Sequence, residues 1–160
     1  MSVLMTPTMM NIAGNIHGGD LLFILDQVAY TCAVRYAKTN VVTLSVDQVR
    51  FGQPIYVGEL VTFFSTINYV GKSSMEVGVK VVAENIFTDV KRHTNSCFFT
   101  MVAVTEGNKP TKIPSFSPST EIEKLRYECA LARKEARIAV EKQNKAMVEQ
   151  VFSKLQPVQA

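Results

Sequence analysis

Hydrophobic residues follow two different patterns along this chain, one typical of a helix and one typical of strands. From Gly18 to about Tyr36, apolar side chains fall on nearly all sides of a helix, which predicts a long buried helix near the start. The segments that follow are rich in β-branched and aromatic residues, as is typical of strands; they span residues 41–49, 60–69, 74–86 and 93–104. Short connections after the second and third of these strands favour antiparallel pairing, with the helix covering one face of the sheet.

A second helical segment follows a linker. Residues 106–118 are rich in Pro, Ser, Lys and Gly, so the sheet is expected to end near Thr105. Thr120 and Glu123 have the spacing of a capping box, and a weak, alanine-rich stripe then predicts a helix to about Phe152. The chain is therefore expected to consist of an α+β domain over residues 5–118 and a C-terminal helical extension over residues 119–160.

Composition excludes several classes of function. The chain has 160 residues, 47% of them apolar, and a net charge of +3, which is too small for a nucleic-acid-binding stripe. The three cysteines are widely spaced and form neither a disulfide framework nor a zinc motif. The N-terminus does not have the pattern of a signal peptide, and no segment approaches the roughly 20 apolar residues of a membrane span. We expect a cytoplasmic protein without metal, nucleic-acid or membrane binding.

The most informative motif is Gly14-Asn15-Ile16-His17-Gly18-Gly19-Asp20, which leads directly into the first helix. Two glycines at a helix start allow a substrate to approach backbone N–H groups, where the helix dipole favours developing negative charge. This is an oxyanion hole in outline, although a glycine pair taken alone also suits a tight structural corner. His17 is interpreted as a loop-packing or ligand-contacting residue, because no nucleophile stands beside it in the sequence.

A single carboxylate stands inside the apolar helix. Burying the Asp26 carboxylate without a partner would cost free energy of folding, so a functional role is favoured for this residue. Asp20 lies on another face and suits the first turn of the helix, while Asp47 is interpreted as an exposed strand residue. Neither a serine nor a cysteine lies in a nucleophile elbow, so water is the expected nucleophile.

Two polar segments offer contacts to an anionic ligand. Gly71-Lys72-Ser73-Ser74 supplies a flexible turn, one cation and two hydroxyls, and Lys91-Arg92-His93 adds a basic cluster at the start of a strand. Each segment taken alone also suits an ordinary surface turn.

Together these motifs resemble the hotdog-fold acyl-CoA thioesterases, in particular the ACOT-type acyl-coenzyme A hydrolases. The similarity spans roughly Met5 to Thr120. Its most specific parts are Gly14-Asn15-Ile16-His17-Gly18-Gly19, Leu25-Asp26-Gln27-Val28-Ala29, Val42-Thr43-Leu44-Ser45-Val46-Asp47, Gly71-Lys72-Ser73-Ser74-Met75-Glu76 and Arg92-His93-Thr94-Asn95.

The resemblance implies a hotdog fold, in which an antiparallel sheet wraps around a long central helix. It also implies homodimers joined edge to edge, often assembled as trimers of dimers into a hexamer. In this family an Asn before the glycine pair and an Asp on the helix act together across the dimer interface, which maps onto Asn15 and Asp26. Coenzyme A would enter only as part of the substrate or product, with its phosphates near Gly71, Lys72, Ser73, Ser74 and Arg92.

These features predict an acyl-CoA thioesterase that releases a fatty acid and coenzyme A. Asp26 would act as general base or as nucleophile, Asn15 would position water or carbonyl, and the N–H groups of Gly19 and Gly18 would polarise the thioester. About 10 Å of helix separates Gly19 from Asp26, which favours a site shared by two subunits. Two alternatives remain open: a hotdog dehydratase or hydratase with His17 as base and Asp26 as acid, and a non-catalytic acyl-CoA sensor.

Overall fold

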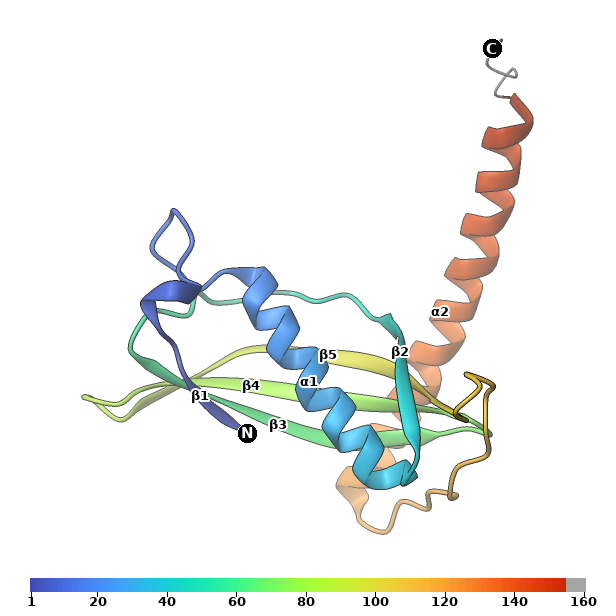
Figure 1. Cartoon of the computed structure of the whole chain (residues 1–160), viewed down its shortest axis with the longest axis horizontal. Coiled ribbons are helices and arrows are strands. Elements are labelled where there is room, and N and C mark those ends of the chain that lie inside the picture. Colours follow the sequence, from blue (N-terminus) through green and yellow to red (C-terminus); the bar gives the residue numbers. More distant parts are fainter. Residues whose placement is uncertain (155–160) are drawn as a thin grey trace. The chain divides into compact units, whose positions relative to one another are not determined.

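A computed structural model describes residues 1–154 of the chain (Figure 1). The predicted helix and the four predicted strands are confirmed, with ends that differ by a few residues. A short first strand and a 3-10 turn were not predicted, because segments of three residues are too short to show a period. The elements are β1 (Ser2–Leu4), η1 (Pro7–Met9), α1 (Gly18–Ala37), β2 (Asn40–Val46), β3 (Glu59–Val70), β4 (Ser74–Asn85), β5 (Val90–Val104) and α2 (Glu121–Lys154).

Within the described residues the strands form one antiparallel sheet in the order β1-β3-β4-β5-β2. The helix α1 lies across one face of this sheet and contacts β2, β3, β4 and β5 (Figure 1). Alternate residues of the central strands point into the resulting core. Val77, Val79 and Val81 of β4 and Cys97 and Phe99 of β5 are almost completely buried. Since β2 is an edge strand, one side of it has no strand neighbour in the protomer.

The expectation that α1 is buried on nearly all sides is wrong for the protomer. Leu25 and Ala29 are fully buried against the sheet, but Phe23 is 65% exposed, and Leu22 and Tyr30 are also exposed. The sheet covers one face of a helix and leaves the opposite face open. Exposed apolar residues that lie together are typical of an interaction surface, so we expect another surface to cover this face of α1.

Three irregularities interrupt the alternation of the strands. Leu44 is an extra residue in β2, Asn68 in β3 and Thr94 in β5, each of them facing a regular stretch of the neighbouring strand. Such β-bulges bend the strand and re-aim the side chains beside them. The bulge at Thr94 places Arg92 and Asn95 on the face that carries α1, because they pair with the core residues Ala83 and Val81.

The chain forms two compact units whose boundary in the sequence lies between Ser117 and Pro118. In the second unit the predicted capping box is confirmed at the start of α2. The N–H of Glu123 donates to Oγ1 of Thr120 at 3.2 Å, and Oε2 of Glu123 accepts from the N–H groups of Ser119 and Thr120. The N–H and hydroxyl of Ser119 and the N–H of Thr120, which all donate to this carboxylate, lower the pKa of Glu123 to about 2. Neither α2 nor α1, the helices of the described residues, is long and apolar enough to cross a membrane.

Candidate functional site

The loop before α1 is a tight turn organised by Asn11. Its side-chain Oδ1 accepts from the N–H groups of Ala13 at 2.9 Å and Asn15 at 3.2 Å, and its own N–H donates to the carbonyl of Asn15 at 2.8 Å. Gly14 lies inside this turn with φ of 82°, a conformation that favours glycine. The loop is anchored to the 51–56 segment, because the N–H of Ile16 donates to the carbonyl of Ile55 at 2.8 Å.

The glycine pair opens the helix, as predicted, but one of its N–H groups is engaged. His17 is the N-cap residue of α1, and its Nδ1 accepts from the N–H of Gly19 at 3.0 Å. A Cβ atom at Gly19 would lie 3.0 Å from the same ring nitrogen, and one at Gly18 would lie 3.4 Å from the ring of Phe51. A side chain at Gly19 would therefore crowd the His17 ring, whereas one at Gly18 would make an ordinary contact with Phe51. For Gly19 to polarise a carbonyl, the His17 ring must give up its hydrogen bond.

A cavity of about 350 Å³ lies at this end of the helix. Four side-chain amides line it, from Asn11, Asn15, Gln53 and Asn95, and the remaining walls come from Gly18 and from apolar residues that include Leu21 and Phe51. In the described part of the chain, no charged side chain lines this cavity. Such a lining suits an uncharged, extended ligand that carries hydrogen-bonding groups.

Asp26 has a partner that the sequence analysis did not single out. Oγ1 of Thr43, on the edge strand β2, donates to Oδ1 of Asp26 at 2.6 Å. The carboxylate is half-buried, and the hydrogen bond from Thr43 reaches one of its two oxygens. Thr43 faces α1 because it pairs with Met101, a core residue of β5. The Asp26–Thr43 pair lies two helical turns from Gly18, which is about 12 Å at 1.5 Å per residue.

The two thiols of the first compact unit do not compete for the role of nucleophile. Burial raises the pKa of Cys97 to about 12, and it also raises the pKa of Cys32. A neutral thiol is a weak nucleophile, so these two residues fit structural roles.

The two candidate sites for phosphate lie far apart in the protomer. Gly71-Lys72-Ser73-Ser74 forms the turn between β3 and β4, where the N–H of Gly71 donates to the carbonyl of Ser74 at 2.7 Å and Lys72 is exposed. Arg92 pairs with Ala83, nine residues along β4 from Ser74, which corresponds to about 30 Å of strand. Within one protomer the structure therefore does not bring these two segments together.

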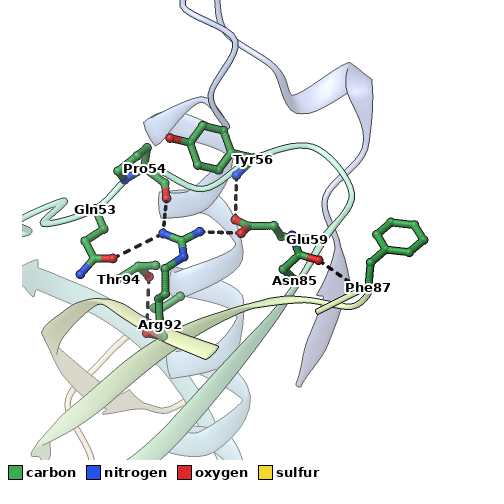
Figure 2. Close-up of polar contacts among 9 residues, drawn as sticks. Gln53, Pro54, Tyr56, Glu59, Asn85, Phe87, Arg92 and Thr94 are labelled. Atoms are coloured by element: carbon green, nitrogen blue, oxygen red, sulfur yellow. Dashed lines mark hydrogen bonds and ion pairs between the residues drawn. The ribbon is translucent and has the colours of Figure 1, made fainter. Parts of the chain in front are cut away.

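Figure 2 shows what the Arg92 guanidinium binds instead. It donates to Oε1 of the buried Glu59 at 2.5 Å and to the carbonyl of Pro54 at 3.0 Å, and it lies 5.8 Å from the ring centre of Tyr56. Oε2 of Glu59 in turn accepts from the N–H of Tyr56 at 2.9 Å. Arg92 thus fixes the 53–56 segment, which forms one wall of the cavity.

Comparisons with known proteins show what this chain is similar to. Residues 13–86 match the family model described as the thioesterase superfamily. The chain is similar to the VdlD protein of Helicobacter pylori, with 56% identity over 137 residues that cover 86% of this chain and 78% of VdlD. It is also similar to the apo structure of a hexameric acyl-CoA thioesterase, with 38% identity, a TM-score of 0.85, and coverage of 88% and 90% of the two chains.

A third relative is the acyl-CoA hydrolase of Staphylococcus aureus, solved with butyryl-CoA, CoA and CoA disulfide. It is 30% identical, with a TM-score of 0.86 and coverage of 95% of this chain and 93% of the other. Alanine variants of that enzyme were also solved; they replace an asparagine, an aspartate 15 positions later and a threonine 17 positions after that. In this chain Asn11, Asp26 and Thr43 have the same two separations.

Proposed function

This chain belongs to the thioesterase superfamily as an acyl-CoA thioester hydrolase, and from that premise we propose that it cleaves its substrate with water activated by Asp26. One observation carries the choice of Asp26: its carboxylate is held by Thr43 at 2.6 Å, and both residues match in spacing the aspartate and threonine replaced in the S. aureus enzyme. The resemblance and the fold expected from the sequence are confirmed by these relatives.

In the proposed reaction, Asp26 takes a proton from water while the water oxygen attacks the thioester carbonyl carbon. Thr43 occupies one carboxylate oxygen, which fixes the orientation of the other toward the water. The tetrahedral intermediate then collapses, the C–S bond breaks, and the thiolate of coenzyme A receives the proton. Direct attack by Asp26, with formation of a transient anhydride, is the alternative for the same residue. Neither route uses a cofactor beyond the coenzyme A of the substrate.

The carbonyl oxygen is proposed to bind at the start of α1, at the N–H groups of Gly19 and Gly18. His17 would leave Gly19 as the substrate enters. Of the two asparagines in the preceding loop, Asn11 is the stronger candidate for positioning water or carbonyl, because its separation from Asp26 matches the S. aureus variants. Asn15, predicted from the resemblance, lines the same cavity and stays a candidate.

Two subunits are proposed to share each site. Within one protomer Asp26 does not line the cavity and lies about 12 Å of helix from Gly18, too far for both to reach one thioester carbon. The open face of α1, with Phe23, adjoins the edge strand β2, whose Leu44 is 67% exposed, and a second copy would cover both. A trimer of such dimers would give the hexamer found for the similar thioesterase.

Thiol release from a series of acyl-CoA chain lengths tests this function. A thiol reagent detects the coenzyme A that a thioesterase frees, whereas a dehydratase with His17 as base would change enoyl absorbance without releasing thiol. Tight binding of acyl-CoA with no thiol release at any chain length would instead identify a sensor.

Lys72→Ala is expected to raise KM for acyl-CoA roughly tenfold with a smaller change in kcat, because an exposed cation in a flexible turn suits the distant phosphates. The same variant should lose little on a pantetheine thioester, which lacks the nucleotide. Lys142→Ala, which removes an exposed lysine of α2, is the matched control. An equal loss for Lys72→Ala on both substrates would contradict the phosphate role.

A further inference from the structure

The amide of Asn95 is buried with one half of its hydrogen-bonding capacity unused. The residue is 4% exposed, and its Oδ1 accepts from Oγ1 of Thr94 at 3.2 Å. Among the described residues, Nδ2 of Asn95 has no hydrogen-bond acceptor, although the residue lines the cavity at the start of α1. A buried N–H without an acceptor is costly, so native proteins seldom keep one without a reason.

The bulge in β5 explains how a polar residue comes to lie there. Asn95 belongs to the row of core-facing residues that includes Cys97 and Phe99, and it is the member of that row that reaches the cavity. Thr94, the extra residue, lies between the ladder pairs of His93 and Asn95 with β4, and its carbonyl accepts from the N–H of Gly52 at 3.2 Å. The bulge is thereby tied to both the sheet and the cavity wall, and the amide is held in place before a ligand arrives.

The surroundings of Asn95 define the group that it would bind. Nδ2 is a neutral donor, and the cavity walls of the described chain carry amides and apolar groups without a charged side chain. A neutral donor in a partly apolar cavity matches an uncharged acceptor oxygen better than a phosphate or carboxylate, whose burial would need a cation. In an acyl-CoA, the carbonyl oxygens outside the nucleotide are those of the thioester and of the two amides of the pantetheine arm, and all three are uncharged acceptors.

We propose that Asn95 is a substrate-positioning residue whose Nδ2–H donates to a carbonyl oxygen of the acyl-pantetheine part of the substrate. The inference rests on the proposed function, since it takes the substrate to be an acyl-CoA. It adds to that function a residue of β5 that binds the uncharged acyl-pantetheine part of the substrate. This residue lies toward the end of the sheet opposite the Lys72 turn. Arg92 supports the same cavity from three residues earlier, by holding the 53–56 wall.

Kinetics of Asn95→Leu, which keeps the number and branching of the side-chain heavy atoms and removes the donor, test the proposal. We expect kcat/KM for an acyl-pantetheine to fall at least about tenfold, as for loss of a hydrogen bond to substrate in a buried site. The thioester of 2-mercaptoethanol, which has no amide, locates the bound oxygen. An equal loss on this substrate identifies the thioester carbonyl, and an unchanged rate identifies a pantetheine amide. Folded Asn95→Leu protein with less than a twofold change on every substrate would overturn the proposal.

A measurement on the unmodified protein keeps the proposal testable if Asn95→Leu does not fold. In a crystal structure with an acyl-pantetheine analogue in which a methylene replaces the thioester sulfur, a ketone that cannot be hydrolysed, a ligand carbonyl oxygen should lie within hydrogen-bonding distance of Nδ2. A bound analogue whose carbonyl oxygens all lie away from Asn95 would overturn the proposal.

The two proposals fail in different ways. If the wild-type protein releases no thiol, the hydrolase function fails, while calorimetric binding of the ketone analogue to the wild-type protein and to Asn95→Leu still reports on Asn95. If the wild-type protein releases thiol and Asn95→Leu is equally active, only the role of Asn95 fails. Ser96→Ala, at the exposed neighbouring position, should leave turnover unchanged.

Discussion

Replacing Asp26 by asparagine is expected to lower kcat at least about a hundredfold without unfolding the protein. The amide has nearly the shape of the carboxylate, and its oxygen can still accept the hydrogen bond from Thr43 that the structure places at 2.6 Å. It cannot, however, take a proton from water. Thiol release at saturating acyl-CoA gives kcat, and circular dichroism with a thermal melt reports whether the fold is intact.

Two further variants sharpen this experiment. Thr43→Val removes the hydrogen bond to Asp26 but leaves the carboxylate, so we expect a smaller loss, about tenfold in kcat. Asp20→Asn changes an exposed aspartate in the first turn of the same helix and should leave kcat within about twofold. Near wild-type turnover in Asp26→Asn would move the chemistry elsewhere, with Asp47 and His17 the next residues to test.

Mixed dimers are expected to recover activity that neither parent has. If Asn11 of one subunit and Asp26 of its partner serve the same site, Asn11→Ala and Asp26→Ala homodimers are both nearly inactive. A mixed dimer then holds one doubly damaged site and one intact site. Random exchange makes about half of the dimers mixed, so the mixture should regain roughly a quarter of wild-type activity. The experiment exchanges differently tagged variants, isolates the doubly tagged species and measures thiol release, which should reach about half of the wild-type value because one of its two sites is intact.

The hydrogen bond between Thr43 and Asp26 supplies an internal control. Because these two residues pair within one protomer, mixing Thr43→Val with Asp26→Ala restores no intact pair and should not raise activity above the average of the parents. The same exchange with Asn15→Ala in place of Asn11→Ala separates the two candidate asparagines. Verified mixed dimers of Asn11→Ala and Asp26→Ala that stay as inactive as their parents would rule out the shared site.

Much of the fold could be predicted because its signals are local. The apolar run of α1 and the β-branched strands each show a period over many residues, and Thr120 and Glu123 cap α2 through neighbours in the sequence. The open face of α1 could not be predicted in the same way. Hydrophobicity shows that a residue such as Phe23 needs cover, but not whether its own sheet or another chain provides it.

The functional residues were harder to predict because their partners are distant in the sequence. Arg92 looked like a free cation, yet it binds Glu59, which lies 33 positions earlier. Thr43 and Asn95 lie next to bulges, where simple alternation no longer tells which face a side chain takes. The spacing of Asn11, Asp26 and Thr43 became informative only beside a relative in which the corresponding residue types had been replaced.

The extra residue in β5 also makes the strand tolerant of a change in length at one position. Deleting Thr94 would still leave Arg92 opposite Ala83 and Asn95 opposite Val81, because the residue has no partner of its own in the ladder. Deleting Cys97 would shift one flank of β5 by a residue and turn every side chain on that flank to the opposite face. The bulge beside the cavity can therefore accommodate a change in strand length during divergence. The same change at a paired position such as Cys97 would move the core-facing side chains of one flank to the opposite face of the sheet.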